Sequence, residues 1–196
     1  MQAFLALVDR LSTAAGAERA QLEAEIWARF GVDKAILALD MSQFSLSVRR
    51  SGILSYLALI RRMQALTAPI VAAHGGQVVK YTADNMIAAF DEPAAAAQAA
   101  LAIHEEIRTR DAGFRVSVGI DYGRFILIPG SDCYGDAVNV ACKLGEDVAD
   151  AGEVLLTEAA RARLAASPVF ALAPQQVSIS GLELTVHAVR MPGGLR

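Results

Sequence analysis

Residues 77–90, QVVKYTADNMIAAF, consist of two short apolar stretches, QVVKY and NMIAAF, separated by the polar sequence TAD. Strand-forming residues on both sides of a tight polar turn predict a β-hairpin. The hairpin places two charged residues, Lys80 and Asp84, next to an apolar run that is typical of a buried strand. Two charges at the edge of a core element require an explanation, because burying a charge without a partner is costly.

The sequences before and after the hairpin predict two helices and a further strand. Apolar residues recur at helical spacing from about residue 46 to residue 74, and HGG at residues 74–76 ends this helix. Residues 92–110 are also helical, with Pro93 in the first turn, where proline is tolerated. The continuous apolar run AILALD, residues 35–40, predicts a buried strand that delivers Asp40 to its end.

The C-terminal half predicts more strands and helices. FRVSVGIDYG, residues 114–123, alternates like a strand, and RFILIPG, residues 124–130, is expected to be its hairpin partner. Residues 136–149 are helical, EVLLT is a strand whose Thr157 caps a further helix, and residues 177–189 form a last hairpin. This order predicts an α+β fold with a ferredoxin-like βαββαβ core, in which helices cover one face of the sheet.

The first 32 residues are expected to form a separate N-terminal helical extension. Residues 2–30 predict two short helices broken at Gly16, and the domain proper is assigned to residues 33–196. The extension is too short for a sensor domain. It is expected to support a dimer, to be autoregulatory or to dock a regulatory partner, with simple packing onto the core as the alternative.

Composition narrows the class of protein. The chain has 196 residues, 54% of them hydrophobic, and a net charge of −3, which suits one globular domain. It has no basic stripe, so nucleic acid is not expected as a partner. No apolar run is long enough for a bilayer and the N-terminus lacks a secretion signal, so we expect no membrane association and a cytoplasmic location. The cysteines and histidines lack metal-ligand spacing.

Asp40 and Asp84 are candidates for a shared site. Both lie at the ends of apolar strands, and their sequence separation of 44 positions leaves room for one helical crossover (84 − 40 = 44). Facing carboxylates repel unless one is protonated or a cation binds, and oxygen ligands without histidine favour magnesium or manganese. The alternative is that Asp84 is a turn residue and Asp40 caps the next element.

Several motifs occur in a fixed order over roughly residues 35–190: ILALDMSQFS, HGGQVVKYTADNMIAAFDEPAAAAQAALAI, VSVGIDYGRFIL, YGDAVNVACKLGED and GEVLLTEAA. In order and spacing they resemble the class III nucleotidyl (adenylate/guanylate) cyclase catalytic domain. The resemblance implies that Asp40 and Asp84 hold two Mg²⁺ (or Mn²⁺) ions against a nucleoside triphosphate. It also implies that a phosphate-binding turn is formed by Met41, Ser42, Gln43, Phe44 and Ser45.

The same resemblance assigns the residues that read the nucleotide. Lys80 and Asp132 match the base-selecting pair of adenylyl cyclases, a donor and an acceptor that complement adenine, although cytosine presents the same order. Asn139 matches the asparagine that positions the ribose. Lys143 stands where the family usually has a transition-state arginine, and its alternative role is a solvated lysine on a helix surface.

In this family the sites lie at a head-to-tail dimer interface, so Lys80 and Asp84 are expected to serve two different pockets of a homodimer. Ala83 and Gln43 replace usual glycines, and Ser180 replaces a phosphate-binding lysine, for which Arg124 or Lys34 could substitute. The resemblance implies an adenylate cyclase that converts ATP to 3′,5′-cyclic AMP and pyrophosphate. The alternatives are a cyclase for CTP, UTP or GTP and a catalytically silent nucleotide-binding domain.

Overall fold

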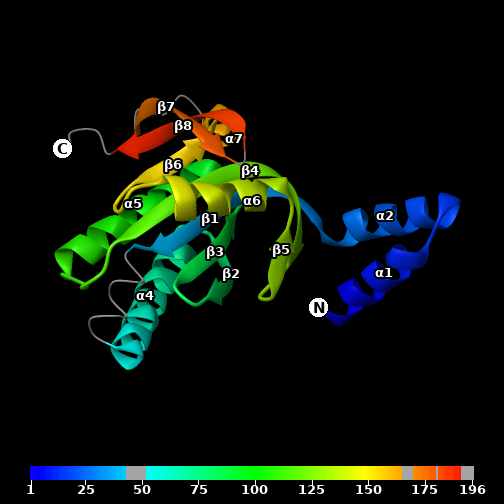
Figure 1. Cartoon of the computed structure of the whole chain (residues 1–196), viewed down its shortest axis with the longest axis horizontal. Coiled ribbons are helices and arrows are strands. Elements are labelled where there is room, and N and C mark those ends of the chain that lie inside the picture. Colours follow the sequence, from blue (N-terminus) through cyan, green and yellow to red (C-terminus); the bar gives the residue numbers. More distant parts are fainter. Residues whose placement is uncertain (43–51, 165–169, 180, 191–196) are drawn as a thin grey trace.

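The computed structural model describes residues 1–42, 52–164, 170–179 and 181–190. In this part of the chain, one mixed sheet is built in the order β2-β3-β1-β4-β6-β8-β7, with β5 paired to β4 (Figure 1). The strands are β1 (Gly31–Met41), β2 (Gln77–Thr82), β3 (Asn85–Phe90), β4 (Val116–Ile128), β5 (Asp132–Tyr134), β6 (Val154–Thr157), β7 (Ala171–Ile179) and β8 (Leu182–Arg190).

The helices confirm the predicted α+β class. They are α1 (Gln2–Thr13), α2 (Gly16–Phe30), α4 (Ile53–Ala73), α5 (Pro93–Thr109), α6 (Asp136–Lys143) and α7 (Glu158–Arg163), with a π-helical turn at Leu144–Val148. Strands β2-β3-β1-β4, with α4 following β1 and α5 following β3, make the βαββαβ core. The predicted start of α4 near residue 46 lies outside the described residues. No helix among those described is both long and apolar enough to cross a membrane.

Helices cover both faces of the sheet, so the prediction of a single covered face is wrong. Successive side chains of a strand point to opposite faces. In β1, Leu37 and Leu39 pack with α4 and α5, whereas Ile36 and Ala38 join the cluster that contains residues of α6. The reason is that α6 is amphipathic and buries Val138 and its alanines against the second face.

The predicted hairpin within residues 114–130 is also wrong, because β4 is a single strand of 13 residues. It pairs without interruption with β1, from Gly31 opposite Ile126 to Met41 opposite Val116. Gly123 therefore lies within the strand. The chain turns after β4 instead, where Gly130 has φ +64°, and the short strand β5 returns along β4.

Helices α1 and α2 form a hairpin that projects from one end of the sheet (Figure 1). Strand β1 begins directly after α2, at Gly31, so the boundary proposed near residue 32 falls within this strand. The helical hairpin packs on the far end of β4 through a small hydrophobic cluster. Its buried members are Phe4, Leu7, Leu22, Ile26, Ile126 and Ile128.

Two glycines allow α6 and the turn after it to approach the sheet closely. A Cβ at Gly145 would lie 2.8 Å from the backbone oxygen of Ala38, and a Cβ at Gly119 would lie 2.6 Å from the backbone nitrogen of Gly145. Neither contact is possible for a larger residue without a shift of the backbone. These positions therefore set the distance between α6 and strands β1 and β4.

Candidate active site

The structure brings Asp40 and Asp84 to the same edge of the sheet. Asp40 lies near the end of β1, where it is opposite Asn85 at the start of β3. Asp84 occupies the turn that precedes β3, and its backbone oxygen accepts a hydrogen bond from the Met41 N–H at 3.3 Å. Two carboxylates that are far apart in the sequence are thus neighbours because β1 and β3 are paired.

The turn itself has an unusual backbone. Ala83 has φ +50°, a left-handed conformation that glycine adopts without strain and that alanine adopts at a cost. It is one of the two positions where the resemblance to the cyclase family led us to expect a glycine. The alanine keeps the turn conformation, so the turn that presents Asp84 is strained.

Tyr56 holds the Asp84 carboxylate. It lies in the first turn of α4, is only 2% exposed, and donates a hydrogen bond from its hydroxyl to Asp84 Oδ2 at 2.8 Å. Burial, followed by the hydrogen bond to Asp84, raises the pKa of the Tyr56 phenol, so the phenol remains a donor at neutral pH. Sequence reasoning did not find Tyr56, because it occupies an apolar position of an amphipathic helix.

Asp40 lies in a strongly acidic environment. Burial, then the charges of Asp84, Glu146 and Asp147, raise the pKa of Asp40 to about 7. Glu146 follows α6 and accepts a hydrogen bond from Asn85 Nδ2 at 2.9 Å. Sequence reasoning did not predict this contribution of Glu146, because it depends on how the turn after α6 packs on the sheet.

Asn85, which lies opposite Asp40, has a side-chain oxygen without a partner among the described residues. Asn85 Oδ1 is buried and accepts no hydrogen bond from the described residues. Those residues contain no group of three His, Cys, Asp or Glu side chains that could chelate a metal ion by themselves. The donor set at the edge is therefore two carboxylates and one amide oxygen, which are the hard oxygen donors that Mg²⁺ and Mn²⁺ prefer.

Lys80 and Asp132 form a second group. Lys80 Nζ on β2 lies 2.7 Å from Asp132 Oδ1 on β5, and both side chains are partly exposed. Asp132 Oδ1 also accepts from the Cys133 N–H, and Oδ2 accepts from the Tyr134 hydroxyl. Burial alone would raise the pKa of Asp132, but these hydrogen bonds outweigh it and lower the pKa. The hydrogen bond to Asp132 raises the pKa of Lys80, so the pair is fully charged at neutral pH.

Asn139 and Lys143 lie one turn apart on α6, and both are exposed. They point away from the sheet, because the buried residues of α6 are on its other side. Lys143 lies 3.7 Å from Asp147, an exposed ion pair. The role of Lys143 at the reacting phosphate stays a prediction, with a solvated surface lysine as its alternative.

The proposed phosphate turn is only partly within the described residues. The Ser42 N–H donates to the backbone oxygen of Arg115 at 3.0 Å, and the Met41 N–H is bound to Asp84. Amide groups free for phosphate would therefore have to come from Gln43, Phe44 and Ser45, which lie outside the described residues, as does Ser180. Ser42 also lines a pocket together with Tyr56 and Arg115.

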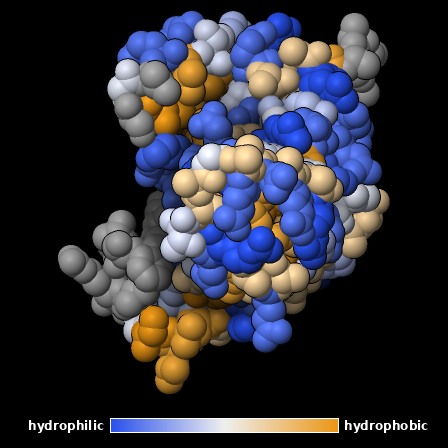
Figure 2. All heavy atoms as spheres, turned by 90° about the vertical axis from the view of Figure 1, so that its right-hand side faces the viewer, coloured by the Kyte–Doolittle hydropathy of each residue, from blue (hydrophilic) through white to orange (hydrophobic). Residues whose placement is uncertain are grey.

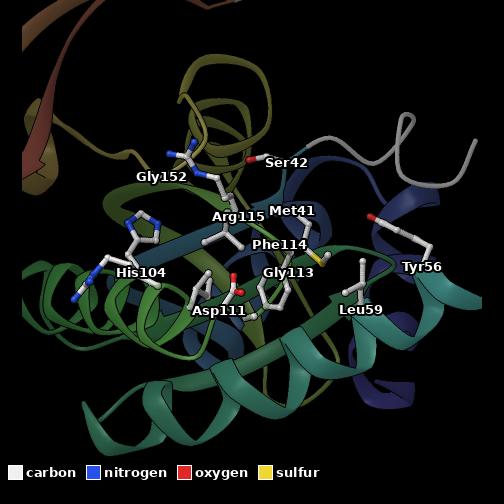
Figure 3. Close-up of a pocket in the computed structure, with 14 residues that line it drawn as sticks. Met41, Ser42, Tyr56, Leu59, His104, Asp111, Gly113, Phe114, Arg115 and Gly152 are labelled. Carbon is white, nitrogen blue, oxygen red and sulfur yellow. The ribbon is translucent and has the colours of Figure 1, made fainter. Parts of the chain in front are cut away.

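A pocket of about 580 Å³ is lined by Met41 and Ser42, which follow Asp40 in the sequence, and by Tyr56, which binds Asp84. Figure 3 shows Ser42 and Arg115 on one side of it and Tyr56 and Leu59 of α4 on another. Arg115 has no carboxylate partner within the described residues, and its guanidinium donates to the backbone oxygen of Ala151. It is a cation in a position to meet an anionic ligand.

The two cations considered as replacements for the missing lysine are engaged elsewhere. Lys34 lies six residues before Asp40 on the same strand, about 20 Å away, and forms an ion pair with Asp91. Arg124 stacks on Trp27, with its guanidinium carbon 4.5 Å from the ring centroid. Within one chain, neither cation therefore lies at the Asp40–Asp84 edge, and the prediction that one of them substitutes at the phosphates stays a prediction.

No hydrogen bond or ion pair between described residues joins the Asp40–Asp84 group to the Lys80–Asp132 group. The pocket in Figure 3 is lined by Tyr56, the partner of Asp84, but by none of the four charged residues of the two groups. Within one chain, the two groups are therefore separate among the described residues.

Comparison with known proteins identifies this arrangement. No family model matches the chain. A putative adenylate cyclase 3 from Rhizobium meliloti is 33% identical over 130 residues, which cover 63% of this chain and 22% of that protein. An adenylate cyclase from Glutamicibacter nicotianae is 27% identical, with 74% of this chain and 36% of that protein covered. The chain thus spans well under half the length of these curated relatives.

Solved structures share the fold over almost their full length. The adenylate/guanylate cyclase/hydrolase from Silicibacter pomeroyi has a TM-score of 0.69 at 28% identity, covering 84% of this chain and 99% of its own. The adenylyl cyclase CyaB from P. aeruginosa has a TM-score of 0.70 at 16% identity, covering 83% of this chain and 96% of its own. The guanylate cyclase domain of RhGC from Catenaria anguillulae, in complex with GTP, has a TM-score of 0.72 at 18% identity, covering 81% of this chain and 96% of its own.

These likenesses agree with the βαββαβ sheet, which is the fold of the nucleotidyl cyclase catalytic domains. The chain is similar in sequence to adenylate cyclases and shares the fold of class III adenylate/guanylate cyclase catalytic domains.

Proposed function

We propose that the chain is the catalytic domain of an adenylate cyclase, which converts ATP to 3′,5′-cyclic AMP and pyrophosphate at the interface of a homodimer. The observation that carries the adenylate assignment is the Lys80–Asp132 pair, 2.7 Å apart and accessible to solvent on one side. Adenine presents an acceptor at N1 and a donor at its 6-amino group, which match the lysine and the aspartate respectively. Guanine presents the reverse polarity at these atoms, and would leave both side chains unpaired.

The acidic edge fits a divalent cation. Asp40, Asp84 and the unpartnered oxygen of Asn85 supply oxygen donors, and a cation would relieve the repulsion that Asp40 experiences. When bound, two Mg²⁺ or Mn²⁺ ions neutralise the triphosphate and favour ionisation of the ribose 3′-hydroxyl. Tyr56 keeps Asp84 oriented toward this edge through its hydroxyl.

The reaction forms a bond from the ribose 3′-oxygen to the α-phosphorus and breaks the bond from that phosphorus to the bridging oxygen of pyrophosphate. The 3′-hydroxyl proton is lost to solvent and the bond electrons leave with pyrophosphate. We assign Arg115 as a cation for the phosphates, because it lines the pocket beside Ser42 without a carboxylate partner. Asn139 is assigned to orient the ribose, and Lys143 to stabilise the charge that develops on the reacting phosphate.

A homodimer is proposed because each chain presents the two half-sites separately. Large hydrophobic side chains are also exposed beside the acidic edge. Ile53, Leu54 and Leu57, at the start of α4, are 53%, 78% and 47% exposed and form an orange area at the lower end of Figure 2. Hydrophobic surface of this kind next to a half-site supports its burial by a second copy.

Mixing two inactive chains tests the shared sites. A chain with Asp84→Asn lacks one half-site, and a chain with Lys80→Ala and Asn139→Ala lacks the other. Their heterodimer would contain one intact site, so cyclic AMP formation should return on mixing. If heterodimers form, as shown by native mass spectrometry, and no activity returns, the shared-site proposal is wrong.

Exchanging the base-reading pair tests the adenylate assignment. Lys80→Glu with Asp132→Ser offers an acceptor to guanine N1–H and a donor to guanine O6. The variant should lose ATP turnover and gain turnover of GTP relative to ATP by at least about ten-fold. An unchanged ratio of ATP to GTP turnover would contradict the role of the pair.

A further inference from the structure

Tyr134 connects the N-terminal helices to the base-reading pair. Its hydroxyl donates a hydrogen bond to Asp132 Oδ2 at 3.1 Å. Its ring stacks on Phe4 of α1, with the centroids 5.7 Å apart and the planes inclined by 13°. Tyr134 therefore touches both the residue assigned to read the base and the helical extension that precedes the catalytic domain.

Tyr134 donates its hydrogen bond to the Asp132 carboxylate oxygen that accepts fewer hydrogen bonds among the described residues. Asp132 Oδ1 already accepts from Lys80 Nζ at 2.7 Å and from the Cys133 N–H at 2.8 Å. Oδ2 accepts only from Tyr134 among the described residues. A carboxylate oxygen has two lone pairs, so Oδ2 is the oxygen that can take a further donor, such as the amino group of a base. Tyr134 fixes the direction in which that oxygen points.

The α1–α2 hairpin packs on β4, the strand that pairs with the β5 strand carrying Asp132 and Tyr134. Ile126 and Ile128 of β4 belong to the cluster that holds α1 and α2, and in the β4–β5 ladder they lie opposite Tyr134 and Asp132 respectively. Phe4 is 7% exposed and is itself held by an edge-to-face contact with Phe30 of α2, at 5.3 Å. In Figure 1, β5 lies on the side of the sheet that faces α1 and α2.

We propose that Tyr134 is a positioning residue for recognition of the nucleobase amino group, and that the α1–α2 hairpin sets its position through Phe4. This inference rests on the proposed role of Lys80 and Asp132 in reading the base. The contacts run from Phe4 to Tyr134 to Asp132 Oδ2, and a shift of the hairpin moves the acceptor that a base must meet. The position of the α1–α2 hairpin thereby affects substrate affinity, in addition to the packing of the hairpin on the domain.

Two substitutions separate the hydroxyl from the ring contact. Tyr134→Phe removes only the hydroxyl and keeps the stacking on Phe4. Phe4→Leu keeps an apolar side chain in the cluster and removes the stacking. Leu5→Ala is the matched control, since Leu5 is the next residue of α1, is 45% exposed and lies outside the hairpin's buried cluster. Circular dichroism and melting temperature establish that each variant folds.

The experiment compares ATP with purine riboside triphosphate, which lacks the 6-amino group, on the full chain with Mn²⁺. Equilibrium binding and turnover are both measured. We expect wild type to prefer ATP, and Tyr134→Phe to reduce that preference by roughly two- to ten-fold, the value of one hydrogen bond. The change should appear in KM, with kcat nearly unchanged. Phe4→Leu should act in the same direction, add little to Tyr134→Phe in the double variant, and differ from Leu5→Ala.

The outcomes distinguish this inference from the proposed function. If wild type binds ATP and the analogue equally well, base reading by Lys80 and Asp132 fails, and the inference fails with it. If wild type prefers ATP and Tyr134→Phe keeps the full preference, the proposed function stands and the positioning role of Tyr134 is wrong. If Tyr134→Phe lowers the preference but Phe4→Leu behaves as Leu5→Ala does, the hairpin is not an input to the site.

Discussion

Replacing Ala83 with glycine should stabilise the protein, although it lies next to a residue of the proposed active site. Ala83 has φ +50° in the turn that carries Asp84. The left-handed conformation costs an L-residue about 1–2 kcal/mol, which glycine removes. Glycine also makes the unfolded chain more flexible, which lowers stability by about 0.5–1 kcal/mol. The expected net gain in the free energy of unfolding is about 0.5–1 kcal/mol. For a chain of this size, that corresponds to a rise in Tm of about 1–4 °C.

Gly75→Ala is the control in the opposite direction, because it replaces a glycine by alanine at another left-handed position. Gly75 has φ +74°, and a Cβ added there would meet no heavy atom within 4 Å, so the substitution tests backbone conformation without a steric clash. It should lower the free energy of unfolding by about 0.5–1 kcal/mol. Both variants are compared with wild type by thermal melts and urea unfolding without metal. If Gly75→Ala is destabilised as expected and Ala83→Gly shows no increase in the free energy of unfolding, Ala83 is not strained. Its assignment to the left-handed conformation would then be wrong.

Three further predictions concern the site and its support. Because the pKa of Asp40 is raised to about 7, between about pH 4 and 7 the folded state keeps a proton that the unfolded state loses, so stability falls as pH rises through this range. Asp40→Asn should therefore raise the Tm measured without metal more at pH 8 than at pH 5. An equal rise at both pH values would contradict the raised pKa. Tyr56→Phe removes the hydrogen bond to Asp84 and should weaken Mn²⁺ binding by roughly two- to ten-fold in calorimetry, whereas unchanged affinity would show that the tyrosine does not hold the ligand. Gly119→Ala places a Cβ 2.6 Å from the backbone nitrogen of Gly145 and should cost about 1–3 kcal/mol of stability in urea unfolding, and an unchanged midpoint would contradict the close approach of α6.

Local patterns in the sequence predict most elements of the fold correctly. The QVVKY–NMIAAF hairpin, the helix that begins at Pro93 and the capping role of Thr157 follow from short-range rules, and the structure contains each of them. The Thr157 hydroxyl accepts from the Ala160 N–H at 3.1 Å, as an N-cap residue should. These features depend on residues only a few positions apart.

The failures came from contacts between distant segments. DYGRF resembles a turn because glycine and polar residues interrupt the apolar pattern, but pairing with all of β1 keeps β4 continuous through Gly123. The amphipathic pattern of α6 shows that one side is buried, but not which face of the sheet buries it. Sequence periodicity carries no information on this choice.

The candidate site divides in the same way. Asp40 and Asp84 could be proposed as neighbours from the strands that carry them, whereas the pairing of Lys80 with Asp132, 52 residues apart, was expected only from the resemblance to the cyclase family. Tyr56 and Glu146 could not be found in the sequence. Their contacts with Asp84 and Asn85 depend on the packing of α4 and of the turn after α6 against the edge of the sheet.

The most direct test of the proposed function is incubation of the purified chain with Mn²⁺ or Mg²⁺ and each of ATP, GTP, CTP and UTP separately. Cyclic products are identified by mass spectrometry, with Asp84→Asn as the matched control. We predict cyclic AMP from ATP with wild type and none from the folded Asp84→Asn variant. A cyclic pyrimidine or cyclic GMP as the main product, cyclic AMP that persists in Asp84→Asn, or no product from a wild-type dimer that binds ATP would contradict it.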